Sequence, residues 1–256
     1  MTAKSEKLGR RKNNSPRDSH PLRKDDCHVI KHKVVKQNME LYFIRHGQSV
    51  NNAGSNNPEY KEHPDPYLTE MGIEQAKYLA KYLKEKQHIT NDRVWNNQNQ
   101  FGFGFTHIYT SLMERAVANE DKFSGLPGKP RSFFEKNFPE LKLPNNLDES
   151  GWWNRPFESD EERQPRADNF FAELIARHAD RQGQPEERIA IVSHGGFFVR
   201  LISSMLKLPW RQAAFDMKSW FLLNNSSISR FDIRDGEIMI SYINQTRHLP
   251  AHLISG

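Results

Sequence analysis

Residues 41–47, Leu-Tyr-Phe-Ile-Arg-His-Gly, decide the fold of this chain, because a short apolar run leads directly into a histidine on a glycine-containing turn. A second run of the same kind, Ile-Ala-Ile-Val at 189–192, leads into His194-Gly195-Gly196. Each apolar run predicts a buried strand. In open α/β sheets ligands bind outside the carboxyl ends of the strands, so we expect His46 and His194 to meet over one site.

The chain from about Glu40 onward alternates predicted strands with predicted helices. Apolar patterns predict strands at 41–44, 106–110 and 188–192, and helices at 69–83, 112–123, 170–175 and 197–205. A hairpin at the sheet edge is predicted over 227–243, with its turn at Asp235-Gly236. Strands separated by helices predict an α/β three-layer sandwich, with a mainly parallel central sheet covered by helices on both faces.

The charge is distributed unevenly along the 256 residues. Residues 1–40 hold 11 Lys and Arg against 5 Asp and Glu, whereas the remainder has a net charge of about −1. The first segment is too polar to bury much apolar surface. We therefore predict a disordered basic N-terminal tail over 1–38 and one catalytic domain over 39–256. The nearly neutral body does not favour a nucleic-acid partner.

Cys27 is the only cysteine, which excludes an intramolecular disulfide and a thiolate metal cluster. No apolar run approaches the length of a membrane span, and the N-terminal residues lack the apolar segment of a secretory signal. The sequence therefore predicts a cytoplasmic protein without a membrane partner. It leaves the oligomeric state open.

Side chains suited to phosphate chemistry follow three of the predicted strands. They are Arg45-His46, residues 111–115 and His194. A neutral imidazole can attack phosphorus, and guanidinium groups neutralise phosphoryl oxygens through bidentate contacts. A second imidazole and the amides of glycine-rich helix starts can donate further hydrogen bonds. The set predicts a site for a phosphorylated small molecule that requires no metal or other cofactor.

Four motifs occur in order along the chain. They are Arg45-His46-Gly47, Leu68-Thr69 to Gly72 with Gln75-Ala76, Ser111-Leu112-Met113-Glu114-Arg115-Ala116, and Val192-Ser193-His194-Gly195. Together they resemble the histidine phosphatase superfamily, in its phosphoglycerate mutase-like branch (branch 1), from about Glu40 to the C-terminus. The resemblance implies the phosphoglycerate mutase-like fold and a phosphatase that hydrolyses phosphomonoesters through a phosphohistidine, independently of metal.

Two alternatives to hydrolysis stay open. A phosphoglycerate mutase-type enzyme would return the phosphoryl group to a sugar acid, but the chain lacks the basic cluster expected around a bisphosphorylated substrate. A non-catalytic phosphate-binding adaptor would retain the clamp without turnover. Candidates for the nucleophile, the acid and the phosphate clamp are all present, which argues against the adaptor.

The resemblance also implies a role for each matching residue. His46 is the nucleophile. Arg45, Arg115 and His194 hold the phosphoryl group, assisted by Asn52 and the Gly195 amide, and Asn51 is the alternative to Asn52. A carboxylic acid between the second arginine and the second histidine protonates the leaving oxygen. Glu149 fits that position best, and Glu140 and Glu158 are the alternatives.

The segment after Glu149, residues 151–156, is expected to set substrate choice. Trp153 is a candidate apolar wall for the leaving group, and Arg155 is a candidate contact for a second anion on the substrate. The alternative is that the tryptophans pack this loop onto the core. The remaining histidines, including His107 and His178, show no metal-ligand spacing, so we expect them to be structural or exposed and predict no metal site.

Overall fold

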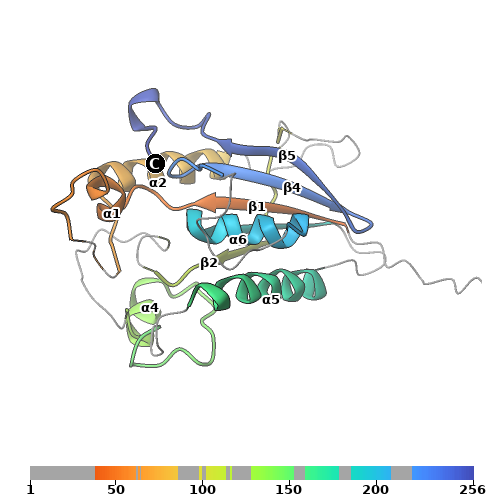
Figure 1. Ribbon diagram of the computed structural model, residues 1–256, viewed down its shortest axis with the longest axis horizontal. Helices are drawn as coiled ribbons and strands as arrows, with labels where there is room; N and C mark the ends of the chain where they lie inside the picture. Colours follow the sequence, from red (N-terminus) through yellow and green to blue (C-terminus); the bar gives the residue numbers. More distant parts are fainter. Residues whose placement is uncertain are drawn as a thin grey trace, which may run out of the picture. The chain divides into compact units, whose positions relative to one another are not determined.

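The strand β1 (Met39–Arg45) occupies the middle of a five-stranded sheet with the order β2-β3-β1-β4-β5 (Figure 1). Two strands continue the sheet in parallel on one side, β3 (Glu187–Ser193) and β2 (His107–Thr110). On the other side β4 (Ile228–Arg234) and β5 (Glu237–Gln245) pair antiparallel. The predicted edge hairpin is confirmed, and it makes the sheet a mixed one with three parallel strands.

The computed structural model describes residues 38–61, 63, 65–85, 98–99, 102–113, 116, 128–152, 159–178, 186–208 and 221–256. All of these residues fall within one compact unit, residues 35–256. The predicted tail over 1–38 lies almost entirely outside the described residues, and so does most of the helix predicted over 112–123. No helix of the described part combines the length and hydrophobicity needed to cross a membrane.

Helices cover both faces of the sheet, as the three-layer prediction requires (Figure 1). Alternate residues of β1, Met39, Leu41 and Phe43, pack with α5 (Asp160–His178) and α6 (Gly195–Leu206). Tyr42 and Ile44 point the other way, toward Phe103 and the partly buried side chains of α2 (Glu70–Glu85). Because both faces are covered, residues 41–44 of β1 form a continuous apolar run rather than an alternating one.

Local signals set the helix ends. Helix α2 begins after Thr69, whose Oγ1 accepts a hydrogen bond from the Gly72 N–H at 3.1 Å. Helix α6 ends at Lys207, which adopts the left-handed conformation with φ 51°. The short helices α1 (Val50–Gly54) and α4 (Arg131–Asn137) were not predicted, since five and seven residues are too few to show a helical period. A 3-10 turn, Ala251–Leu253, lies beside α2.

Candidate active site

His46 and His194 leave the ends of two neighbouring parallel strands. Arg45 is opposite Ser193 in the register of β1 and β3, and the His46 N–H donates to the Ser193 carbonyl at 3.0 Å. The centroids of the two imidazole rings lie 5.1 Å apart. The expectation that two strand ends distant in sequence converge is confirmed by this geometry, because parallel pairing puts both carboxyl ends at one edge of the sheet.

The backbone carbonyl of Gly47 fixes which ring nitrogen of His46 carries a proton. Nδ1 of His46 lies 2.6 Å from the Gly47 carbonyl oxygen. A carbonyl can only accept, so Nδ1 carries the proton, and a neutral ring then has its lone pair on Nε2. The side chain is buried, with 5% of the residue exposed. In its neutral form His46 therefore has the acceptor lone pair on Nε2, the atom with which an imidazole can attack phosphorus.

Arg45 supplies a half-buried positive charge to the same cavity as His46. Its Nη1 donates to the Leu223 carbonyl, and its Nε is buried without a hydrogen-bond partner among the described residues. Burial lowers the pKa of Arg45 from its ordinary value, because the charged guanidinium loses hydration. A guanidinium remains charged at neutral pH all the same. A bound anion would restore the lost interactions, so this residue suits a phosphoryl group.

A third strand end, that of β2, reaches the site through Ser111. Its N–H donates to the Val192 carbonyl at 3.0 Å, which carries the end of β2 alongside β3. Its hydroxyl lies 2.8 Å from Nε2 of His194. Ser111 therefore orients the second imidazole, a role that the sequence pattern alone did not reveal.

Asn52 is held so that only its amide NH2 remains for a ligand. Its Oδ1 accepts from the Ser49 N–H at 3.2 Å, from the Ser49 hydroxyl at 3.0 Å and from Nδ2 of Asn225 at 3.1 Å. Asn51 uses its amide differently: Nδ2 donates to the His63 carbonyl, and Oδ1 accepts from Tyr60 and the His63 N–H. The geometry favours Asn52 over Asn51 as the phosphate contact.

These residues surround a small cavity of about 210 Å³. Its described lining is Arg45, His46, Ser49, Asn51, Asn52, Pro66, His194, Gly195 and Gly196. The lining includes a guanidinium and two imidazoles but, among the described residues, no carboxylate. The 12-residue helix α6 also begins at this cavity, directly after its N-cap residue His194. The His194 side chain makes no capping hydrogen bond to the first backbone amides of the helix. A guanidinium, two imidazoles and a helix N-terminus together suit a phosphate dianion.

A larger hollow of about 530 Å³ lies along α5, and its character is different. Its described lining includes three carboxylates, Glu161, Glu162 and Glu173, against one guanidinium, Arg166. Carboxylates repel a phosphorylated ligand. The smaller cavity is therefore the candidate active site.

Gly47 is required by packing rather than by close approach of a ligand. A Cβ at this position would lie 2.4 Å from the Gly72 carbonyl oxygen in the first turn of α2. Gly72 is equally confined, since a Cβ at this position would lie 2.0 Å from the backbone carbonyl oxygen of Gln48. Gly195 and Gly196 are open by comparison, and a Cβ at Gly196 would meet nothing within 4 Å. The spacing of Gly47 and Gly72 thus reflects how α2 packs against the turn after β1.

Glu149, the predicted general acid, is engaged at the start of α4. Its Oε1 accepts from the Ser132 N–H at 2.9 Å and its Oε2 from the Ser132 hydroxyl at 2.6 Å. It is exposed and does not belong to the described lining of the cavity. Glu140 lies in the turn after α4, also exposed. Glu158 lies outside the described residues.

Three other predicted site residues, Arg115, Trp153 and Arg155, also lie outside the described residues. Their neighbour Trp152 is described: its Nε1 lies 3.3 Å from Oδ2 of Asp65, and a Cβ at Gly128 would clash with its ring. Asp65 is 1% exposed and precedes Pro66 of the cavity wall. Trp152 thus ties the loop after Glu149 to the segment bordering the cavity, which matches the packing alternative for this tryptophan.

Known proteins are similar to this chain in sequence and structure. The family model of the histidine phosphatase superfamily (branch 1) matches residues 41–95 and 98–246. A glucosyl-3-phosphoglycerate phosphatase of Mycobacterium tuberculosis is 26% identical over 178 residues, covering 66% of this chain and 76% of the relative.

Two solved structures illustrate the structural likeness. The phosphoserine phosphatase of Entamoeba histolytica in complex with 3-phosphoglyceric acid has 20% identity and a TM-score of 0.48, covering 83% of this chain and 100% of that one. A mycobacterial glucosyl-3-phosphoglycerate phosphatase has 19% identity and a TM-score of 0.47, with coverage of 81% and 100%.

Proposed function

This chain belongs to the histidine phosphatase superfamily (branch 1), and on that premise we propose that it hydrolyses phosphomonoesters of small metabolites through a phosphohistidine at His46. The observation that carries the proposal is the hydrogen bond from Nδ1 of His46 to the Gly47 carbonyl. It fixes the attacking lone pair on Nε2, in a cavity that also contains Arg45 and His194. Phosphoryl transfer depends mostly on positioning and charge stabilisation, and this cavity supplies both.

The reaction proceeds in two steps. In the first, Nε2 of His46 attacks phosphorus, the bond between phosphorus and the leaving oxygen breaks, and Glu149 gives its proton to that oxygen. In the second, water attacks the phosphohistidine, the P–N bond breaks, and the Glu149 carboxylate takes a proton from the water. The products are the alcohol and inorganic phosphate, with both side chains restored.

Four groups support the phosphoryl oxygens during both steps: the Arg45 guanidinium, the His194 imidazole, the Asn52 amide and the Gly195 N–H. Arg115 stays a prediction for the opposite side of the clamp, and Trp153 and Arg155 stay predictions for contacts to the leaving group. Glu149 must exchange its hydrogen bonds with Ser132 for the leaving oxygen when substrate binds.

The choice of test substrates follows from the sequence relative. Because the 26%-identical protein is a glucosyl-3-phosphoglycerate phosphatase, a phosphorylated sugar acid is the first compound to test. Sugar phosphates, phosphorylated amino acids and 3-phosphoglycerate complete a panel assayed with the full chain in the presence of a chelator. Free phosphate is measured for each compound, and 3-phosphoglycerate is also analysed for isomer formation.

We expect phosphate release from at least one compound, with a phosphohistidine at His46 detectable by mass spectrometry after rapid quenching. His46→Ala should abolish both signals. His252→Ala, which removes an exposed histidine outside the cavity, is the matched control and should retain both. Isomer formation without phosphate release would identify a mutase instead, and phosphate binding without any turnover would identify an adaptor.

A further inference from the structure

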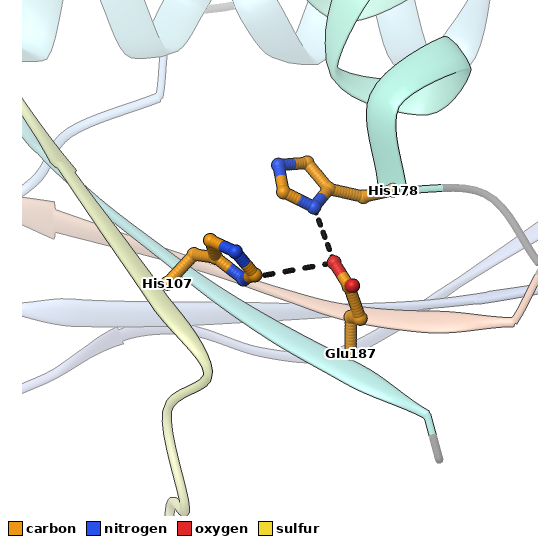
Figure 2. Close-up of side chains that lie close together, drawn as sticks. All are labelled: His107, His178 and Glu187. Carbon is orange, nitrogen blue, oxygen red and sulfur yellow. Dashed lines mark hydrogen bonds and ion pairs between the residues drawn. The ribbon is translucent and has the colours of Figure 1, made fainter. Parts of the chain in front are cut away.

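Three side chains with metal-binding groups meet at the end of the sheet opposite the candidate active site (Figure 2). His178 is the last residue of α5, Glu187 is the first residue of β3, and His107 is the first residue of β2. The catalytic pair follows the carboxyl ends of β1 and β3, whereas this cluster lies at the amino ends of β2 and β3. The two sets of residues therefore do not share a ligand.

The ligand atoms converge closely. Nδ1 of His178 is in hydrogen-bond contact with Oε2 of Glu187, and Nδ1 of His107 lies 3.6 Å from the same oxygen. One ligand atom from each residue can be chosen so that all three lie within 4.8 Å of one another. In a tetrahedral zinc site with bonds of about 2.1 Å, ligand atoms stand about 3.4 Å apart. The His107–Glu187 separation is already close to this spacing, whereas His178 and Glu187 must move apart to admit an ion.

A neighbouring hydroxyl already orients the buried ligand. The His178 side chain is 3% exposed, and its Nε2 lies 2.6 Å from the Tyr109 hydroxyl. Metal-bound histidines usually have their second ring nitrogen hydrogen-bonded in this way, which fixes the ring plane. With a metal on Nδ1, the ring proton resides on Nε2 and donates to the Tyr109 oxygen, so the imidazole stays neutral. The cluster thus includes an outer partner as well as ligands.

No hydrogen bond joins His107 to Glu187. The 3.6 Å separation between His107 and Glu187 is too long for a hydrogen bond, and the nearer partner of His107 Nδ1 is the Thr106 hydroxyl at 3.1 Å. The two imidazole rings nevertheless lie side by side, with centroids 4.7 Å apart. A cation between them would engage both rings and the carboxylate at once. The His107 side chain is 47% exposed, which gives an ion a path to the site.

We propose that His107, His178 and Glu187 bind one divalent transition-metal ion, with zinc as the best match to two imidazoles and one carboxylate. Magnesium and calcium prefer all-oxygen ligand sets, so they do not fit. Three protein ligands leave a fourth position for water. The ion would join the end of α5 to the starts of β2 and β3 and so stabilise this end of the fold, with no part in phosphoryl transfer.

The test measures zinc binding to the full chain after removal of metals with a chelator. Titration calorimetry with zinc chloride is expected to give one ion per chain, and zinc is expected to raise the melting temperature. His107→Ala and Glu187→Gln should each weaken this affinity at least about tenfold, because each removes one of three ligands. His107→Ala removes a half-exposed side chain, so a melting curve without zinc that matches the wild type shows that it folds.

Two further variants test whether zinc binds at a site other than His107, His178 and Glu187. His46→Ala removes one of the catalytic imidazoles, which form the most plausible competing zinc site, and His252→Ala removes an exposed histidine. Both should keep the affinity and the melting-temperature shift. Zinc that binds equally to the wild type and His107→Ala, or that is lost in His46→Ala, overturns the proposal, as does the absence of binding. Phosphate release by His107→Ala should equal that of the wild type, so this test does not depend on the proposed function.

Discussion

The side-chain amide of Asn225 donates a hydrogen bond to the backbone carbonyl of His46 at 3.2 Å, although the two residues are 179 positions apart in the sequence. The neighbouring Ser226 N–H donates to the same carbonyl at 3.0 Å. The turn that precedes β4 therefore holds the turn that contains His46. Asn225 also donates to Asn52, so one buried side chain connects the proposed nucleophile, His46, to the proposed phosphate contact, Asn52.

We predict that Asn225→Ala lowers kcat by about 10- to 100-fold, because a displacement of the nucleophile by a fraction of an ångström disturbs in-line attack. KM should change much less, since Arg45 and His194 remain. Steady-state kinetics on the best phosphomonoester of the panel separate the two constants. Asn137→Ala, an exposed position at the end of α4, should leave both unchanged. An equal rise in KM with unchanged kcat would contradict a positioning role.

Glu149 and Ser132 offer a test of the general acid. Glu149→Gln should lower kcat about 10²- to 10⁴-fold for an alkyl phosphate, because the leaving alkoxide then lacks a proton. The loss should be much smaller for p-nitrophenyl phosphate, whose leaving group needs no protonation. Ser132→Ala removes the hydroxyl that occupies the Glu149 carboxylate and should keep or raise kcat.

Glu140→Gln is the matched control for that experiment, since Glu140 is the sequence alternative and is also exposed. It should behave as the wild type with both substrates. If Glu140→Gln shows the substrate-dependent loss and Glu149→Gln does not, the assignment of the acid moves to Glu140.

The structure predicts a large loss of stability for alanine at Gly47 and a small effect for alanine at Gly196. Gly47→Ala should destabilise the fold by about 2–3 kcal/mol, because its Cβ would overlap the Gly72 carbonyl oxygen and force α2 away. A Cβ at Gly196 would meet no neighbour within 4 Å, and the residue lies in the first turn of α6. Gly196→Ala should therefore change the free energy of unfolding by less than about 1 kcal/mol. Urea unfolding followed by circular dichroism measures both. Similar losses of unfolding free energy from the two substitutions would show that α2 does not pack closely against Gly47 in the turn after β1.

The meeting of His46 and His194 could be predicted from sequence because it needs only two apolar runs and the rule that parallel strands end at one edge. The contacts that hold these two histidines in place could not be predicted from the sequence. Asn225 and Ser111 reach the histidines through the register of the sheet, which no local pattern encodes. Helix α4 was missed because seven residues are too few to show a helical period, and the Ser132 N–H in its first turn is bonded by Glu149, 17 positions away. The same limitation hid the meeting of His107, His178 and Glu187.

His248 should make the folded state sensitive to acid. Its ring stacks on Tyr82, with centroids 5.4 Å apart, and burial lowers the pKa of His248 to about 4. In the unfolded chain the pKa is about 6.5, so the unfolded state binds the proton first as the pH falls. The contribution of His248 to stability is therefore complete above about pH 6.5 and is lost progressively between pH 6.5 and 4. Partial exposure of the ring reduces the effect to about 1–2 kcal/mol.

The variant His248→Phe keeps an aromatic ring against Tyr82 and removes the titration. Its free energy of unfolding should fall less than that of the wild type between pH 7.5 and 5, by about 1–2 kcal/mol, as measured by urea unfolding at each pH. His252→Phe makes the same substitution at an exposed histidine and should follow the wild-type pH dependence. Parallel curves for His248→Phe and the wild type would mean that His248 is as readily protonated in the fold as in the unfolded chain.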